Sequence, residues 1–391
     1  MPNRRSVLKG LGVALVGAPI GAAFAAGQIS GGGASAAGTA LPLTIVNNSG
    51  KYANSQISYY IVGTNLATGQ QSFVTPDGTL TPVTLSINGP DGYADLSIPL
   101  ASGGDTTLAI PADMSGRIYF SLGDKLKFKA VTDGAGNAAL QYPAGWVSGD
   151  PSYNVLHDCI EFTHNSSGMF CNTTMVDMFS VPLSITLKGS QTQTTGTLVS
   201  GGRANIFSAI KANADFAPLV VGDLRVIAPG HGIDTGIFRA DYFNSYIDQV
   251  WSQYSGQQLT VRVDSGTYTG QVSGGTFNFS GGVASFGKPS TRDVFFCDGA
   301  LAAPNDGRTG PVAAVLGAAF NRSTLLSRPN QPSTDPATFY QAEVTNHYSK
   351  VLHANTVDGK AYGFPFDDVV GFASYIQDTA PSSFTVELTP F

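Results

Sequence analysis

The chain has 391 residues, of which 42% are apolar and 12% are charged, and its formal net charge is −6. This composition can build a large core, which excludes global disorder, and no apolar run reaches the roughly eighteen residues that a membrane-spanning helix needs. The 21 Lys and Arg residues are scattered and outnumbered by acids, so we expect no nucleic acid and no membrane partner.

The first 25 residues have the pattern of a signal peptide. The pair Arg4-Arg5 precedes an apolar stretch over Gly10–Phe24, and Ala23-Phe24-Ala25 is a small-residue cleavage site. The paired arginines favour the bacterial twin-arginine route over an ordinary secretory signal. We therefore expect a secreted protein, with residues 26–40 forming a flexible leader rich in Gly, Ser and Ala.

Residues 41–200 are predicted to form a β body. Short runs rich in β-branched and aromatic residues alternate with turn signals such as Pro76-Asp77-Gly78 and Asp133-Gly134. The predicted strands include Leu43–Val46, Gln56–Val62, Val83–Ile87, Arg117–Leu122 and Val181–Lys188. Strands in this number with alternating polarity are typical of a β-sandwich or barrel.

Residues 201–391 are predicted to form a mixed α/β half. Helical spacing of apolar residues predicts helices over Arg203–Ala214, Arg239–Tyr254, Gly310–Leu326 and from Asp335 to His353. Strands are expected at Thr260–Val263, Phe277–Phe279 and Ser383–Leu388. The last strand could return to the β body, which makes the boundary near residue 200 soft. The fold class is thus mainly β with an added α/β part.

Three cysteines accompany the predicted export. Cys159 and Cys171 enclose a short loop and could be bridged, while Cys297 could compete for either partner. The spacing leaves the pairing open. Disulfides are too few to replace a hydrophobic core.

Most catalytic motifs are missing from the sequence. It has no HExxH motif, no Cys/His cluster with zinc spacing and no GxSxG elbow. We therefore expect neither a metal nor a cofactor. Only three of the 27 acidic residues are glutamates, and one of them, Glu161, lies inside an apolar run.

The segment around Glu161 suggests paired carboxylates. Two predicted strands, His157–Asn165 and Met169–Phe179, flank a turn at Ser166-Ser167-Gly168. If the hairpin tip lies at Gly168-Met169, Glu161 and Asp177 fall opposite each other, roughly 5–9 Å apart, as in glycoside hydrolases. Repulsion and desolvation would then raise the pKa of one acid. The alternative is a surface hairpin whose acids face water.

At these residues the chain resembles the laminaripentaose-producing β-1,3-glucanases of glycoside hydrolase family 64, a branch of the thaumatin-like proteins. The likeness is carried by Glu161-Phe162-Thr163, by Asp177 sixteen residues after the glutamate, by Asp293–Asp306 and by Gly359–Asp368. It extends over about residues 41–391. It implies a thaumatin-like β-sandwich or barrel domain and a mixed α/β domain that flank an open groove for β-1,3-glucan.

The resemblance also implies residue roles. Glu161 would be the general acid and Asp177 the general base of an inverting endo-hydrolysis of linear β-1,3-glucan, such as laminarin or fungal wall glucan. Short laminari-oligosaccharides would be released. The positions expected to contact sugar are Thr163, Asn165, Phe170, Thr174, Tyr362 and Asp367. Phe170 stands where the family pattern leads us to expect a tryptophan platform, so it can stack on a sugar but lacks the indole N–H.

Two other interpretations remain at this stage. One is a thaumatin-like protein that binds β-glucan without cutting it, although a pure binder needs neither acid. The other is a retaining hydrolase that uses the same two acids. We expect a monomer, because an open polymer groove needs no partner subunit.

Overall fold

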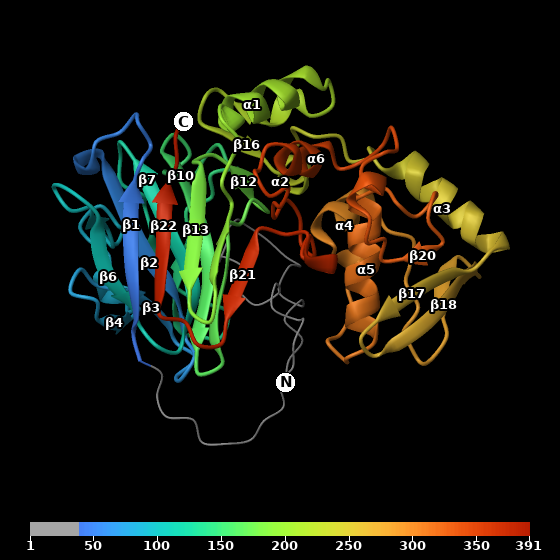
Figure 1. Ribbon diagram of the computed structural model, residues 1–391, viewed down its shortest axis with the longest axis horizontal. Helices are drawn as coiled ribbons and strands as arrows, with labels where there is room; N and C mark the ends of the chain where they lie inside the picture. Colours follow the sequence, from blue (N-terminus) through green and yellow to red (C-terminus); the bar gives the residue numbers. More distant parts are fainter. Residues whose placement is uncertain (1–38) are drawn as a thin grey trace.

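The computed structural model describes residues 39–391 (Figure 1). The predicted signal peptide and all but the last two residues of the predicted leader lie outside the described residues. Two large sheets pack face to face, and both contribute to one core. Side chains such as Ile45, Phe120, Phe162 and Val386 are at most 1% exposed there. This β body confirms the expectation of a mainly β fold.

The first large sheet has five strands. Their order is β14 (Thr192–Thr195), β13 (Leu183–Lys188), β22 (Ser383–Leu388), β1 (Leu41–Asn47) and β6 (Thr106–Ile110). The last strand of the chain, β22, runs parallel to β1 and antiparallel to β13. The C-terminal strand therefore returns to the β body and closes its first sheet.

The second large sheet has eight strands and carries the candidate site. Its order is β21 (Tyr375–Asp378), β11 (Gly168–Asn172), β10 (Leu156–Asn165), β7 (Met114–Leu122), β2 (Ile57–Asn65), β3 (Gln71–Val74) and β4 (Leu80–Pro82), with β5 (Ile98–Pro99) beside β2. Its outer face bears a second apolar cluster, partly formed by the hairpin of β8 (Lys129–Thr132) and β9 (Ala138–Gln141).

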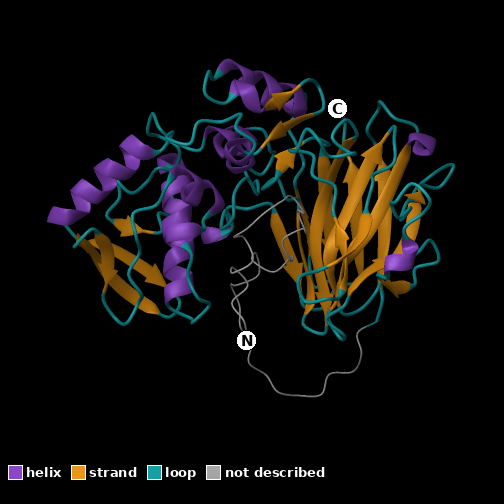
Figure 2. Cartoon of the chain, turned by 180° about the vertical axis from the view of Figure 1, so that it is seen from behind, coloured by secondary structure: helices purple, strands orange, loops and turns teal. Residues whose placement is uncertain are grey.

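The helices and two small sheets form the mixed half, which begins beside the large sheets and extends away from them (Figure 2). The helices are α1 (Gly202–Ala212), α2 (Pro229–Asp234), α3 (Asn244–Gly256), α4 (Thr291–Phe296), α5 (Thr309–Asn321) and α6 (His347–Ala354). The small sheets consist of β12 (Met178–Phe179), β16 (Arg225–Ile227) and β15 (Val220–Val221), and of β19 (Thr276–Phe279), β18 (Gly266–Ser273), β17 (Leu259–Val263) and β20 (Asn330–Gln331). A separate aromatic-rich core holds this half together.

Short 3₁₀ turns connect the elements. They are η1 (Asn54–Gln56), η2 (Leu85–Ile87), η3 (Ala217–Leu219), η4 (Gly299–Leu301), η5 (Pro336–Thr338) and η6 (Val369–Gly371). Within residues 39–391, no helix has the length and apolar character needed to cross a lipid bilayer.

Several predicted elements differ from the structure; the helix expected over Gly310–Leu326, for example, ends at Asn321. The segment 83–87 is not a strand, because η2 occupies Leu85–Ile87. The helix expected from residue 239 begins only at Asn244. The helix expected over 335–353 is interrupted: Asp335 caps only the short η5, Tyr340 has a φ of 59°, and α6 starts afresh behind the Asn346 cap. A left-handed residue cannot continue a right-handed helix, so the backbone turns there.

The three cysteines are free and buried in three separate apolar clusters. Cys159 lies on the outer face of the second sheet, while Cys171 faces the sandwich core. Opposite faces of a sheet prevent the Cys159–Cys171 bridge that the spacing allowed. Burial raises the pKa of each thiol above its usual value.

Candidate active site

Glu161 lies in the middle of β10, on the outer face of the second sheet. Its strand neighbours Ile160 and Phe162 point into the sandwich core, as period-two alternation predicts. Across the ladder Glu161 pairs with Arg117 on β7 and with Asn172 on β11. Arg117 Nε and Nη2 both donate to Glu161 Oε1, at 3.1 and 2.9 Å, and Asn172 Nδ2 donates to Oε2 at 3.2 Å. Neighbouring strands therefore hold both carboxylate oxygens.

The hairpin register differs from the predicted one. Asn165 pairs with Gly168, so the loop consists of Ser166 and Ser167, and Glu161 lies opposite Asn172 instead of Asp177. Gly168 starts β11 with a φ of +128°, and a Cβ there would lie 2.2 Å from the carbonyl oxygen of Asp378. The glycine is needed for this close approach of two backbones, not for the turn.

Asp177 lies outside the β10–β11 hairpin. β11 ends at Asn172, and Asp177 immediately precedes β12, which pairs with β16 in a different sheet. Backbone contacts brace this segment: the Ala228 N–H donates to Asp177 O at 3.0 Å, and the Met175 N–H donates to Tyr362 O at 2.8 Å. The segment that connects β11 of the second large sheet to β12 of the small sheet therefore places Asp177 at the site.

The two acids nevertheless meet at Arg117. While Nε and Nη2 bind Glu161, Nη1 donates to Asp177 Oδ2 at 3.2 Å and also to Tyr119 Oη at 3.3 Å. The side chains of Glu161, Arg117 and Asp177 are 10%, 21% and 25% exposed. One guanidinium thus joins two partly exposed carboxylates from distant parts of the chain.

His231, on α2, is a second partner of Asp177. Its Nε2 lies 2.8 Å from Asp177 Oδ1, and its ring stacks on Trp146 with centroids 4.1 Å apart. Burial alone would raise the pKa of Asp177, but the charge of Arg117 and the hydrogen bond from His231 hold it well below the usual range. This environment favours the ionised form of Asp177.

A small cavity of about 20 Å³ lies beside Arg117 and Asp177. Its polar lining includes Thr174, Tyr119 and His157. This volume suffices for one water molecule. Thr174, predicted as a sugar contact, is buried at this cavity and accepts a weak hydrogen bond from the Val176 N–H.

Two of the predicted sugar contacts, Thr163 and Phe170, face each other across neighbouring strands. They are paired across β10 and β11, next to the Glu161–Asn172 pair, and both are half-buried. Thr163 Oγ1 shares a 2.7 Å hydrogen bond with Ser115 Oγ. Asn165, also half-buried, lies at the strand end, where its Oδ1 accepts from the Ser167 N–H. These side chains share the face of Glu161.

Tyr362 lies close to the site but is 2% exposed. Its backbone forms an isolated β-bridge with Thr174, and its hydroxyl has no hydrogen-bond partner among the described residues. Burial raises its pKa well above the usual value, and the nearby acids Asp368 and Glu161 add to the shift. The structure thus places the side chain beneath the surface of the site.

Asp367 has a structural environment, contrary to its predicted sugar contact. It is fully buried, and its carboxylate accepts from Arg322 Nη2 at 3.1 Å, His353 Nε2 at 3.0 Å, Ser349 Oγ at 3.1 Å and the Gly363 N–H at 3.0 Å. These four donors occupy the carboxylate. We therefore withdraw the sugar-binding assignment of Asp367.

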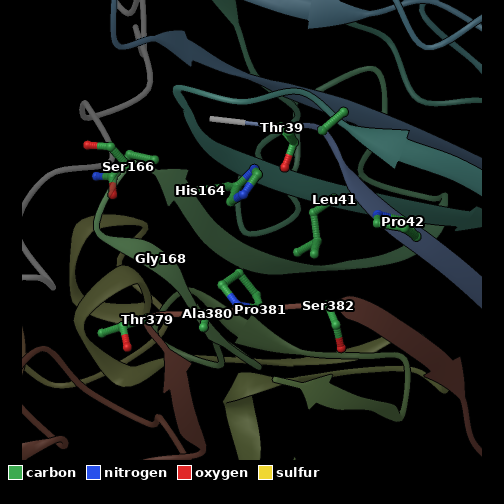
Figure 3. Close-up of a pocket in the computed structure, with 12 residues that line it drawn as sticks. Thr39, Leu41, Pro42, His164, Ser166, Gly168, Thr379, Ala380, Pro381 and Ser382 are labelled. Carbon is green, nitrogen blue, oxygen red and sulfur yellow. The ribbon is translucent and has the colours of Figure 1, made fainter. Parts of the chain in front are cut away.

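A second cavity lies away from the acids. It has a volume of about 340 Å³ at the end of the β10–β11 hairpin, and the start of β1 and the segment between β21 and β22 complete it (Figure 3). Of the predicted site residues, only Asn165 lines it. The chemistry is located by the ion-pair geometry instead of by cavity size.

Sequence reasoning missed Arg117, Asn172, Trp146 and His231. Arg117 is the only charged residue of β7, so the criterion that selected Glu161, a charge in an apolar strand, would also have found it. His231 lies between two glycines after Pro229, in a segment without periodicity. No local pattern marks that histidine.

The chain is similar to known proteins along most of its length. The family model of glycoside hydrolase family 64, described as beta-1,3-glucanase, matches residues 39–388. A solved structure of a laminaripentaose-producing beta-1,3-glucanase in complex with laminaritetraose is 39% identical, with a TM-score of 0.82 over 90% of this chain and 99% of that one. A beta-1,3-glucanase domain from Clostridium beijerinckii is 31% identical, with a TM-score of 0.80 over 90% of this chain and 98% of that one.

A curated relative agrees as well. The glucan endo-1,3-beta-glucosidase of Cellulosimicrobium cellulans is 35% identical over 376 residues. The match covers 92% of this chain and 66% of the relative, so the chain spans slightly less than two thirds of that protein's length. The family match covers nearly all described residues. The chain therefore belongs to glycoside hydrolase family 64, the beta-1,3-glucanases.

Proposed function

We propose that this protein is an endo-acting β-1,3-glucanase that hydrolyses linear β-1,3-glucan with inversion and releases short laminari-oligosaccharides. The observation that carries the proposal is the convergence of Glu161 and Asp177 on Arg117. Because both acids bind nitrogens of one planar guanidinium, their bound oxygens are at most roughly 8–9 Å apart. Inverting glycoside hydrolases separate their two carboxyl groups by roughly 6.5–9.5 Å.

In the proposed reaction Glu161 is the general acid. Its proton moves to the glycosidic oxygen as the bond between that oxygen and the anomeric carbon breaks. Asp177 is the general base: it takes a proton from a water molecule whose oxygen bonds to the anomeric carbon from the opposite face. The sum is one water consumed and one bond cleaved, with Glu161 left ionised and Asp177 left protonated until solvent resets both.

The outer face of the second sheet is the proposed floor of the glucan groove. Phe170 offers an aromatic face on which a pyranose ring can stack, and Thr163 and Asn165 offer polar atoms beside it. A strand-spaced series of sugar contacts suits an extended polymer better than a small ligand.

Family features beyond the mainly β fold are also proposals. We propose that the β body is related to thaumatin-like proteins, that the protein is monomeric, and that it is exported by the twin-arginine route. Two packed sheets with a returning C-terminal strand support the first proposal. The Arg4-Arg5 leader supports export, and three free, buried thiols fit a protein that folds before it crosses the membrane. N-terminal sequencing of the secreted protein tests the cleavage site.

The decisive experiment incubates the purified protein with linear β-1,3-glucan. We expect new reducing ends, a ladder of laminari-oligosaccharides, and the α-anomer as the first product seen by proton NMR. A first-formed β-anomer would replace inversion by retention on the same acids. Binding without new reducing ends would replace the enzyme by a β-glucan-binding protein.

A further inference from the structure

Asp177 is held from both halves of the molecule. Arg117, on β7 of the β body, donates to Oδ2 at 3.2 Å, and His231, on α2 of the mixed half, contacts Oδ1 at 2.8 Å. An ionised carboxylate can only accept hydrogen bonds, so His231 Nε2 carries the proton of this contact. Each oxygen of Asp177 therefore has one fixed donor, and the plane of the carboxylate is defined.

The His231 ring is clamped between two aromatic side chains. It stacks on Trp146 at 4.1 Å with an interplanar angle of 18°, and it meets the Phe296 ring at 5.2 Å and 79°. A Cβ at Gly230, the preceding residue, would lie 2.8 Å from Phe296, so the helix backbone approaches that ring closely. The clamp leaves the imidazole little freedom to rotate away from Asp177.

The outer side of the clamp is held as well. The Arg292 guanidinium lies 4.4 Å above the Phe296 ring and forms an ion pair at 2.6 Å with Asp234, on the same helix as His231. Trp146 lies in the connection between β9 and β10, and its ring is only partly buried. The β body and the mixed half thus each contribute one wall of the clamp.

We propose that His231 is a positioning residue for Asp177: clamped by Trp146 and Phe296, it orients the carboxylate that takes a proton from the attacking water. This inference rests on the proposed function. A general base needs a lone pair aimed at the water, and fixing both oxygens through their other lone pairs selects that direction. His231 makes no contact with substrate in this role.

The electrostatics of Asp177 agree with the geometry. The groups that interact electrostatically with Asp177 are Arg117 from β7, Cys159 from β10, His231 from α2 and Tyr348 from α6, and Glu161 from β10 faces it across Arg117. Burial raises the pKa of Asp177, while Arg117 and His231 lower it. Losing the His231 hydrogen bond would therefore raise this pKa, and the base would become protonated at a higher pH.

The test compares two variants that separate the ring from the donor. His231→Phe keeps an aromatic ring in the clamp but cannot donate to Asp177, whereas His231→Gln keeps a donor at about the Nε2 position. For His231→Phe we expect kcat to fall about 10- to 100-fold, with KM changed by less than about twofold. The acid limb of its pH profile of kcat/KM should shift to higher pH by about one unit.

The donor-retaining variant provides the rescue. His231→Gln should keep its acid limb near the wild-type position and lose clearly less kcat than His231→Phe. The matched control is His347→Phe, because His347 is also packed against an aromatic ring, Phe216, but bonds a backbone carbonyl far from the acids. This control should retain the wild-type kcat and pH profile.

Two outcomes would overturn the positioning role. One is a wild-type kcat and acid limb in His231→Phe; the other is an equal loss in both His231 variants without any shift of the limb. If His231→Phe does not fold, as judged by circular dichroism, Trp146→Ala takes its place, since it removes the clamp and keeps the donor. An unchanged profile there also overturns the proposal.

Asp177→Asn in the same assay separates this inference from the proposed function. If Asp177→Asn hydrolyses glucan at the wild-type rate, the proposed function itself fails. If Asp177→Asn is inactive while His231→Phe is fully active and keeps the wild-type acid limb in its pH profile, only the positioning role fails.

Discussion

Arg117 and Asp177 are sixty positions apart in the chain, but Arg117 Nη1 lies 3.2 Å from Asp177 Oδ2 in the structure. The same guanidinium binds Glu161 through its two other nitrogens, so a single cation lies between the two acids. Two carboxylates at this distance would repel each other at low dielectric. Arg117 removes that repulsion and holds both side chains in place, which makes it the centre of the site.

The first prediction concerns the two acids. Glu161→Gln and Asp177→Asn should each lower kcat by at least about 10²- to 10⁴-fold, because each removes one proton-transfer group. Reducing-end assays on linear β-1,3-glucan measure the loss, and circular dichroism checks that both variants fold. Substantial residual activity in either folded variant would contradict the assigned role.

The second prediction concerns Arg117. Arg117→Met leaves Glu161 and Asp177 without their shared cation, so we expect the free energy of unfolding to fall by about 3 kcal/mol at pH 7. Urea denaturation measures this change. Arg262→Met on β17 is a matched control, because Arg262 is an exposed strand arginine, and its replacement should change stability by less than about 0.5 kcal/mol. Equal stability of the two variants would show that the bridge contributes nothing.

The third prediction tests the structural role of Asp367. Burial raises the pKa of this carboxyl, but His353 and Arg322 outweigh burial and lower it below the usual value. Asp367→Asn leaves the buried Arg322 unpaired and should cost about 3–5 kcal/mol of unfolding free energy near pH 7. The activity of the folded fraction should change by less than about twofold. A large rise in KM without loss of stability would restore the sugar-binding assignment.

The sign of the pH dependence follows from the same pKa. An acid whose pKa is lowered by folding stabilises the protein above its unfolded pKa of about 3.9, and this contribution is lost as the pH falls below that value. The stability difference between wild type and Asp367→Asn should therefore be full above about pH 5 and shrink in more acidic solution. Urea denaturation at several pH values measures it, and a difference that grows towards low pH would contradict this linkage.

The fourth prediction concerns Phe170. Phe170→Trp adds stacking area and an N–H donor, so KM for laminarin should fall by a few-fold, whereas Phe170→Ala should raise KM about fivefold or more. The reaction class should not change, which product analysis verifies. Identical KM values for the three proteins would exclude Phe170 as a sugar platform.

Local patterns predicted the strands well and the helices less well. The final strand was expected at Ser383–Leu388 and occurs there, because alternation over six residues suffices to define it. The helix expected over 335–353 was wrong in its middle part, where Tyr340 donates its N–H to the Arg322 carbonyl and adopts a left-handed conformation. That contact joins distant segments and has no local signature.

The candidate site was likewise predicted only in part. Composition and strand period alone singled out Glu161 as an unusual acid and placed it on the face opposite Ile160 and Phe162. The hairpin register was wrong by five positions on the partner strand, because Gly168 was taken for a turn residue when it serves a backbone contact with Asp378. The strand-pairing argument for Asp177 was wrong, since Asp177 lies in a connection between two sheets; only the family resemblance also pointed to this residue.

The amino-acid sequence determined which residues are charged within apolar strands and which face each strand presents, because these follow from side-chain chemistry and a two-residue period. Tertiary structure alone decided that Arg117, Glu161, Asp177 and His231 meet. Their encounter depends on the packing of one large sheet against a small sheet and a helix from the other half of the chain. Such contacts are set by burial and hydrogen bonding over long sequence separations, and no local pattern records them.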